Sequence, residues 1–332
     1  MTAKRVLLLL ASVLVSAASV AVILRDIKLD DVASSISKAD GGLLGLAFLF
    51  VALSMFTRGI RWWGLLGKEL PLLRAVHLVN LTFLGNQLPL RLGEAARSLL
   101  VTREGVSIEK AAASILVERL IDTLLVVLMI AATVGQLPDA PDYVTVPASR
   151  FGLLALVAFL CLLGLARNPD KAKQLLALMT RKLPALDRLP LARIADNLLD
   201  GLAVLTNLRI LAFTLVWTVI AWSTSLATFY LLHQALGIEV SYAQSVPLGV
   251  SLAALGIALP FTIAAVGPFE AAIIVTGQLV GMDSLAAVSL GFLFHGLSVF
   301  GYIVLGSASL MALGLSPGTA FAAEKGAKPV KR

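Results

Sequence analysis

Long uncharged apolar runs separated by short polar segments make up most of the chain. The first run, residues 6–24, would form a helix of about 28 Å at 1.5 Å per residue, which matches the hydrocarbon thickness of a bilayer. Lys4 and Arg5 before it also fit a signal peptide, but the run is long for one. We predict six membrane-spanning helices, over residues 6–24, 41–57, 111–135, 149–166, 210–232 and 285–312.

Two further apolar stretches, residues 75–102 and 244–281, are interrupted by helix breakers. The first breaks at residues 85–89 and the second between Pro260 and Pro268. Because basic residues mark the cytoplasmic side of a membrane protein, the distribution of Lys and Arg decides how these stretches lie. Basic clusters flank both ends of the first stretch, and segments without Lys or Arg flank both ends of the second. Each stretch is therefore predicted to enter and leave the membrane on one side, as a re-entrant hairpin.

The predicted fold class is an all-α polytopic membrane protein, built as an inverted-topology repeat of three spans plus one re-entrant helical hairpin each. The first repeat covers residues 1–135 and the second covers residues 149–314. An offset of 176 aligns Glu94-Ala-Ala with Glu270-Ala-Ala, within thirty pairs that hold five identities. The composition alone gives about two or three identities over that length. The charged residue of the second hairpin thus falls opposite a charged residue of the first.

The remaining polar segments are placed in the cytoplasm. Residues 168–209 are too charged to span, but Leu191, Ile194 and Leu198 recur at helical spacing and predict an amphipathic helix on the membrane face. A solvated linker helix is the alternative. Residues 315–332 are predicted to form a basic cytoplasmic tail, so both termini are expected in the cytoplasm.

The composition supports a lipid environment and excludes several classes of protein. Hydrophobic residues make up 58% of the chain and charged residues 14%, against about 25% charged in an average soluble domain. A cytosolic enzyme, a secreted domain and a disordered chain are excluded, because none could cover this much apolar surface. The single Cys161 cannot form a disulfide framework, and the sequence has no nucleotide-binding loop or metal-ligand spacing, so we expect no cofactor and no metal. The net charge of +7 is explained by the membrane topology, and we expect no nucleic-acid partner.

Charged residues inside the predicted bilayer region are costly and therefore indicate candidate sites. Arg91, Glu94 and Arg97 follow the first hairpin break at a spacing of three, which places them on one side of a new helix. Two guanidiniums beside a free helix N-terminus make an anion site, and phosphate is the commonest anion of membrane headgroups. We predict a substrate-binding group made of Arg91, Glu94, Arg97, Asn86 and Gln87. The alternative is an ion-pair cluster that pins the hairpin.

A second charged group lies in the following span. Glu118, Arg119 and Asp122 fall within about one helical turn, so they can face a common partner. Their net negative charge would pair with Arg91 and Arg97. We predict a gating or ion-pair group, and a structural bridge between hairpin and span fits this pattern as well as substrate contact does.

Glu270 is the charged residue of the second hairpin. Because burial disfavours a charged carboxylate, a lone Glu near the midplane is a proton-coupling candidate. A carboxylate that binds the freed amides of the broken helix is an equal alternative. His295 is expected to be a packed, hydrogen-bonded side chain. The Arg-Trp-Trp segment at residues 61–63 is typical of an interfacial anchor at the end of the second span.

At these motifs the sequence resembles a known family. Residues 84–97 and 116–122 are similar to the paired signature of the lysylphosphatidylglycerol synthase transmembrane family, also called flippase-like membrane proteins. The segment Gly267-Pro-Phe-Glu270 is similar to a Pro- and Gly-rich segment of that family. The resemblance implies a stand-alone member without a synthase domain, located in the inner membrane of a bacterium, with the charged residues above at the family's polar positions.

The resemblance implies a lipid flippase or translocase, which would move an anionic or phosphate-bearing lipid of the glycolipid, aminoacyl-lipid or hopanoid type. One alternative is an integral membrane transferase that acts on a lipid-linked phosphate, with Glu94 or Glu118 as base. Another is a non-catalytic subunit of a lipid-synthesis complex. The expected partner is a membrane lipid with an anionic or phosphate headgroup, and a homo-oligomer or a lipid-synthesis enzyme stays open as a protein partner.

Overall fold

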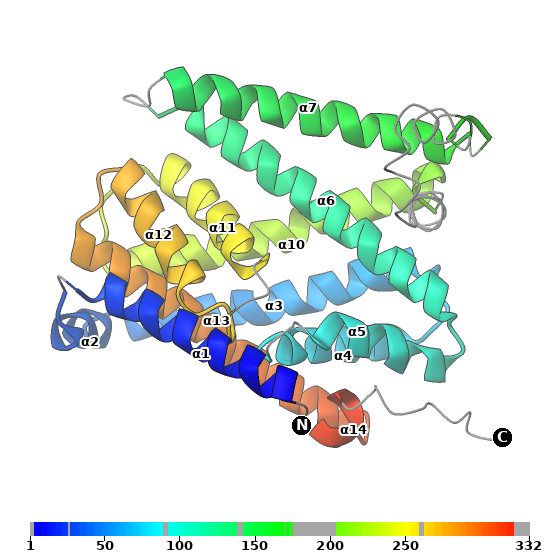
Figure 1. Cartoon of the computed structure of the whole chain (residues 1–332), viewed down its shortest axis with the longest axis horizontal. Coiled ribbons are helices and arrows are strands. Elements are labelled where there is room, and N and C mark those ends of the chain that lie inside the picture. Colours follow the sequence, from blue (N-terminus) through cyan, green and yellow to red (C-terminus); the bar gives the residue numbers. More distant parts are fainter. Residues whose placement is uncertain are drawn as a thin grey trace.

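The computed structural model describes residues 3–25, 27–88, 92–137, 142–168, 170–172, 174, 204–258 and 262–321 (Figure 1). Every regular element within these ranges is a helix. The elements are α1 (Ala3–Ile23), α2 (Leu29–Ser37), α3 (Gly41–Leu65), α4 (Leu72–Gly85), α5 (Leu92–Leu100), the 3-10 helix η1 (Val101–Glu104), α6 (Ile108–Val134), α7 (Asp142–Ala166), the 3-10 helix η3 (Val204–Thr206), α10 (Leu208–Ala235), α11 (Tyr242–Ala258), α12 (Pro268–Leu279), α13 (Ser284–Ala312) and α14 (Pro317–Phe321).

Each of the six predicted spans coincides with a helix, namely α1, α3, α6, α7, α10 and α13. Three of them, α3, α10 and α13, are long and apolar enough to cross a membrane. Shorter apolar helical segments are Ser12–Ile23, Leu72–Gly85, Arg150–Ala166 and Tyr242–Ala258. Helix α6 has 27 residues, within the 25 to 29 of the three candidates, but Glu118, Arg119 and Asp122 interrupt its apolar surface near its middle. Its charges therefore have to be satisfied inside the protein.

Helix α3 extends beyond its predicted end. The prediction stopped at residue 57 because Arg58 and Arg61 follow, whereas the helix continues to Leu65. Arg61 is 1% exposed and forms an ion pair with Asp122 of α6. An arginine whose charge is balanced within the protein does not end a membrane helix. The helix predicted from the apolar run alone was therefore too short.

The two predicted hairpins are both helix–break–helix pairs. Helix α4 ends at Gly85 and α5 begins at Leu92, and α11 ends at Ala258 with α12 beginning at Pro268. In each pair, a glycine lies where the two helices come closest. A Cβ on Gly93 would lie 2.0 Å from the Thr82 carbonyl oxygen, and one on Gly256 would lie 2.7 Å from the Pro268 carbonyl oxygen. No side chain fits at either point, so glycine lets the two helices of each pair approach.

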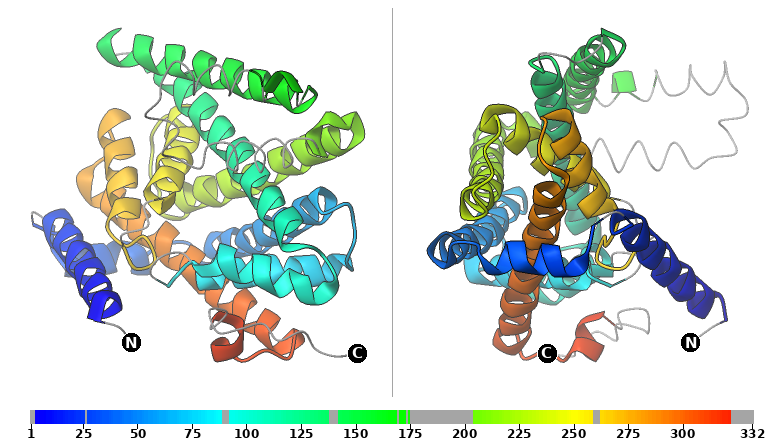
Figure 2. Two further views of the ribbon diagram at one scale, coloured as in Figure 1. Left: turned by 45° about the vertical axis from the view of Figure 1, so that its right-hand side comes forward. Right: turned by 90° about the vertical axis from the view of Figure 1, so that its left-hand side faces the viewer.

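Other elements were not anticipated. Helix α2 lies between the first two predicted spans, where no helix was predicted, and α14 begins the predicted tail. The rest of the tail after residue 321 lies outside the described residues, as does most of the predicted amphipathic segment 168–209. Helix α7 packs on α6 at one edge of the molecule, and α1 contacts α12 at another (Figure 2).

The long helices cross-connect the two halves of the chain. Helix α13 contacts α4, and α6 contacts α11, so each helix pair packs against the long helix that follows the other pair. Helices α12 and α13 begin 176 residues after α5 and α6, respectively. Helices α3 and α10 pack antiparallel, because Ser54 Oγ lies 3.3 Å from Ser225 Oγ while Gly64 faces Phe213.

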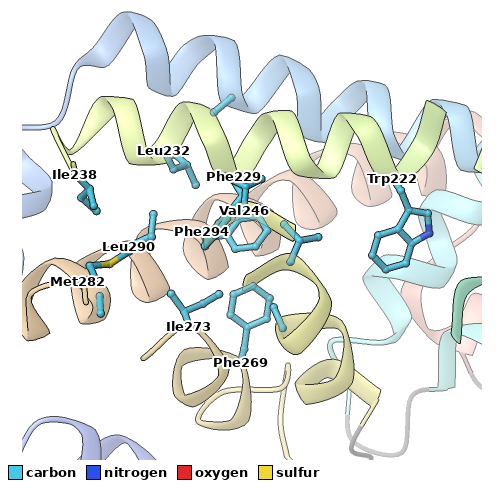
Figure 3. Packing of buried hydrophobic residues seen from close by; sticks show 14 of the residues in the cluster. Trp222, Phe229, Leu232, Ile238, Val246, Phe269, Ile273, Met282, Leu290 and Phe294 are labelled. Carbon is cyan, nitrogen blue, oxygen red and sulfur yellow. The ribbon is translucent and has the colours of Figure 1, made fainter. Parts of the chain in front are cut away.

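The largest apolar core joins α10, α11, α12 and α13. Three aromatic rings from three helices meet there: the Phe294 centroid lies 4.9 Å from that of Phe229 and 5.2 Å from that of Phe269 (Figure 3). Trp222 stands at one end of this cluster (Figure 3). A second core surrounds the fully buried Trp62 and joins α3, α4 and α5. Both helix pairs are thus held by apolar packing on rigid neighbours.

Replacing Gly93 by alanine should separate α4 from α5. The added methyl group would overlap the Thr82 carbonyl oxygen and lie 2.8 Å from Asn86 Oδ1. We expect the free energy of unfolding to fall by about 1–3 kcal/mol, as at other overpacked sites. A lower Tm of the purified protein in detergent would show this loss. Gly45→Ala in α3 is the matched control, because its Cβ meets nothing within 4 Å. Equal Tm values for the two variants would contradict the close approach.

Candidate functional site

A cavity of about 250 Å³, lined by both charged and apolar residues, lies between the two helix pairs. Residues of α3, α4, α5, α6, α10, α11, α12 and α13 line it, so both halves of the chain contribute. Its charged lining residues, among those that the structure describes, are Arg58, Arg61, Glu94, Arg97, Glu118, Arg119 and Asp122. The first and second predicted charged groups are therefore brought together in one site, Arg91 lying outside the described residues.

Arg61 is the centre of a buried ion-pair network. Its Nη1 and Nη2 donate to Asp122 Oδ1 and Oδ2 at 2.6 and 3.0 Å, a two-pronged contact, and Nη2 also donates to Glu118 Oε1 at 3.3 Å. Thr218 Oγ1 of α10 accepts from Nη1 at 3.3 Å, and the Trp222 indole donates to Asp122 Oδ1 at 3.0 Å. The paired geometry is the strongest that arginine forms with carboxylates.

The interpretation of residues 61–63 as an interfacial anchor is therefore wrong for Arg61 and Trp62. Both side chains are enclosed by the protein, since Arg61 is 1% exposed and Trp62 is 0% exposed. Trp62 donates from its indole to Ser114 Oγ of α6 at 2.9 Å. One sequence feature could have indicated that Arg61 is buried. Glu118 and Asp122 lie one turn apart on α6, and such an acid pair needs a cation from a facing helix.

Arg97 links the first helix pair to the same network. Its Nη2 donates to Glu118 Oε2 at 2.7 Å, and its guanidinium lies over the Trp62 ring, 4.6 Å from the ring centroid. Glu118 thus binds arginines from two helices, α3 and α5, with one oxygen each. The expected pairing of Arg97 with the acids of α6 is present. Arg97 is thus bound to Glu118 and Trp62 of the protein itself.

The network becomes more exposed toward the start of α5. The Arg119 side chain is 43% exposed and the Glu94 side chain 27%, against 1–3% for Arg61, Glu118 and Arg97. Arg119 bridges the two levels, since its Nη2 lies 3.3 Å from Asp122 Oδ2 and its Nε 3.9 Å from Glu94 Oε1. The cavity therefore has a deep charged floor and a more open charged rim.

Asn86 and Gln87 lie at the break between α4 and α5 and line the cavity. Asn86 Oδ1 accepts from the Gly93 amide at 3.1 Å, which satisfies one of the free N–H groups at the start of α5. Gln87 Nε2 donates to the Phe83 carbonyl at 2.9 Å, while its buried Oε1 has no hydrogen-bond partner among the described residues. Gln87 thus keeps an acceptor available, and Asn86 spans the break.

Glu270 lies at the start of α12 and is paired with His295 of α13. Glu270 Oε2 accepts from the Gly267 amide at 2.8 Å, which is the capping arrangement considered from the sequence, and Oε1 lies 2.5 Å from His295 Nδ1. The second ring nitrogen of His295 lies 2.8 Å from the Ala264 carbonyl oxygen. His295, expected as a packed, hydrogen-bonded side chain, holds both the carboxylate and the broken segment before α12.

These contacts fix the proton count of the pair. A carbonyl oxygen only accepts, so His295 Nε2 must carry a proton toward Ala264. One further proton must then lie between His295 Nδ1 and Glu270, on either partner. The pair holds one shared proton in a buried setting, where Glu270 is 1% and His295 6% exposed. The backbone that it grips is strained, because Ala264 and Ala265 have φ values of 52° and 62°.

Comparison with protein families finds one family model, and its match includes all the described residues of the cavity. A model of the family described as the lysylphosphatidylglycerol synthase TM region matches residues 9–306. The match runs from α1 into α13 and so includes both helix pairs and the cavity. The resemblance inferred from the motifs is confirmed, and no synthase domain is evident in this sequence. No curated protein matches the chain.

Two substitutions at Glu270 should show whether its hydrogen bonds or its acid group stabilise the fold. Glu270→Gln can accept from Gly267 and donate to a neutral His295, so we expect Tm to stay within a few degrees of the wild type. Glu270→Ala leaves the Gly267 amide and His295 Nδ1 without partners, at a cost of about 1–3 kcal/mol for each buried group. Thermal unfolding in detergent checks both. A Tm for Glu270→Gln as low as that of Glu270→Ala would contradict the shared-proton arrangement.

Proposed function

The chain belongs to the family of the lysylphosphatidylglycerol synthase TM region, and on this premise we propose that it is a lipid flippase. The protein is a multi-pass integral membrane protein, and family membership implies a role connected with lipids. The proposed cargo is a lipid with an anionic or phosphate headgroup. Its headgroup would pass through the cavity while its acyl chains stay in the bilayer.

The observation that carries this proposal is the charged cavity between the two helix pairs. A headgroup moved through hydrocarbon loses its water, which costs several kcal/mol or more for a charged group. The cavity offers ionised side chains, several hydroxyl groups and the free Gln87 Oε1 in place of water. The described lining residues include four arginines and three carboxylates, so an excess of one positive charge favours an anion.

The cross-connected packing supports alternating access to this cavity. We propose that the two halves are inverted repeats whose helix pairs enter from opposite faces, α4 and α5 from the cytoplasm and α11 and α12 from outside. Each pair packs on the long helix of the other half, so rocking of one half would open one side as it closes the other. The antiparallel contact of α3 with α10 is the natural hinge line, because both helices line the cavity.

The Glu270–His295 pair is the proposed site of proton coupling. It lies beside the cavity, since His295 and its neighbours Ala264 and Phe269 line the wall. Gain or loss of the shared proton would leave one of the two groups charged, and would weaken the grip on the strained segment before α12. Opening of that segment could thereby follow the proton, with Glu94 staying among arginines on the other side of the cavity.

The transferase alternative is less well supported by the geometry. Glu94 and Glu118 were the two candidate bases, and Glu118 accepts hydrogen bonds from both Arg61 and Arg97. A carboxylate held by two guanidiniums is a poor base, because taking up a proton would cost both ion pairs. Transport needs no base and uses the same residues as fixed charges, so we prefer it.

Transport is tested directly by reconstitution. Proteoliposomes with the purified protein should move fluorescent phospholipids between leaflets faster than protein-free liposomes. Ala254→Phe places a ring in the cavity wall, and a transport barrier raised by about 1–3 kcal/mol corresponds to a rate about 5–150-fold lower. Ala132→Phe, on an exposed face of α6, is the matched control and should transport normally. Wild-type rates equal to those of empty liposomes, across a panel of headgroups, would contradict the proposal.

The proposed inverted topology has its own test. Single cysteines at Glu104 and Asp283 are introduced into a Cys161→Ser background and labelled with an impermeant maleimide. Glu104 ends the segment after the first helix pair, and Asp283 follows the second. We expect the two sites to label from opposite sides of the membrane, Glu104 from the cytoplasm. Labelling of both from the same side would remove the inverted repeat.

A further inference from the structure

Arg58 differs from the other arginines of the cavity in its partners. Arg61, Arg97 and Arg119 each have a carboxylate oxygen within 3.9 Å. Among the described residues, Arg58 has none within 4.0 Å, although its half-buried side chain lines the cavity. Residues 89–91 and 259–261, which adjoin lining residues in the sequence, contain no Asp or Glu. Arg58 is therefore the source of the cavity's positive excess.

The groups in direct contact with Arg58 are neutral and fix its orientation, while the charges of Asp122, Arg61 and Arg119 act on it from farther away. Its Nε donates to Ser54 Oγ and its Nη2 to Ser225 Oγ, each at 3.3 Å. The guanidinium also lies over two aromatic rings, 5.5 Å from the Trp222 centroid and 5.9 Å from the Phe83 centroid. Aromatic faces and hydroxyls hold a guanidinium in one plane without neutralising it. A cation held in this way within a membrane protein is costly unless an anion joins it.

We infer that Arg58, Ser54 and Ser225 form the binding seat for a phosphodiester group. This inference rests on the proposed function, because it places the headgroup phosphate of the transported lipid at Arg58. A phosphodiester carries one negative charge, which matches the excess of one positive charge among the described lining residues. The Nη1 of Arg58 and the second N–H of its Nη2 offer donors to the phosphate oxygens, in the forked pattern that arginine makes with phosphate. The Ser54 and Ser225 hydroxyls accept from Nε and Nη2 and hold the guanidinium in this orientation.

The seat joins the two halves of the chain. Ser54 belongs to α3 and Ser225 to α10, and their hydroxyl oxygens lie 3.3 Å apart. A phosphate bound there would contact both helices at the line where they pack antiparallel. Arg97, the arginine favoured by the sequence, is instead engaged by Glu118 and Trp62. The geometry thus moves the anion contact from the first helix pair to α3.

Binding to the full-length protein in dodecyl maltoside micelles, which contain no phosphate, tests the seat. The probes are dihexanoyl phosphatidylglycerol, inorganic phosphate and dihexanoylglycerol, each titrated by calorimetry. For the phospholipid we expect Arg58→Gln to raise Kd about 10–150-fold, the range for loss of a charge-assisted contact. Arg58→Lys should recover little, because an ammonium cannot reach both serines at once. Dihexanoylglycerol, which lacks the phosphate, should not bind.

The controls separate this inference from the proposed function. Arg74→Gln removes an exposed arginine paired with Glu104 and should leave Kd unchanged. Ser225→Ala, which removes one hydroxyl, should raise Kd by a smaller factor and keeps the test valid if Arg58→Gln does not fold. Unchanged Kd in both Arg58→Gln and Ser225→Ala would overturn the seat while leaving transport intact. Phosphate bound as tightly as the phospholipid would keep an anion seat but remove the lipid assignment, and transport failure with normal binding would overturn the flippase alone.

Discussion

The Glu118 carboxylate binds Arg61 of α3 with one oxygen and Arg97 of α5 with the other, and the form of the cavity depends on this contact. It ties the first helix pair to a long helix and to α6 in a region that is 1–3% exposed. Asp122, one turn further along α6, doubles the hold on Arg61. Because losing one partner would leave a nearly buried charge unpaired, the charges have to balance locally, and the helices must keep the spacing that lets them do so.

The second helix pair is held by a different device. Glu270 binds one histidine and one amide, with a single shared proton and no arginine among the described contacts. Arginine–carboxylate ion pairs thus fix one side of the cavity, and a hydrogen bond between a carboxyl group and an imidazole fixes the other. The Phe229, Phe269 and Phe294 cluster gives the second half a rigid apolar backing (Figure 3).

Much of the helical layout followed from the sequence, since uncharged runs of membrane length predicted the positions of six long helices and the breakers predicted both breaks. The partners of the charges did not follow, because a linear pattern does not show which helices face one another. Arg61 precedes two tryptophans at the end of an apolar run, a pattern shared by interfacial anchors, so its burial became evident only when α6 was placed beside α3. For the same reason the sequence pattern shows Arg58 only as one basic residue of a cluster before the first hairpin, and it does not indicate the contact between Glu270 and His295, which are 25 residues apart.

A double-mutant cycle on Arg97 and Glu118 measures the interaction on which this account rests. The free energies of unfolding of Arg97→Leu, Glu118→Leu and the double variant would be obtained by SDS titration in mixed micelles. We predict a favourable coupling energy of about 2 kcal/mol or more, within the upper range for residues in one ion-pair network. The double variant should therefore lose less unfolding free energy than the sum of the losses in Arg97→Leu and Glu118→Leu. A coupling energy within about 0.5 kcal/mol of zero, the usual value for independent sites, would contradict it.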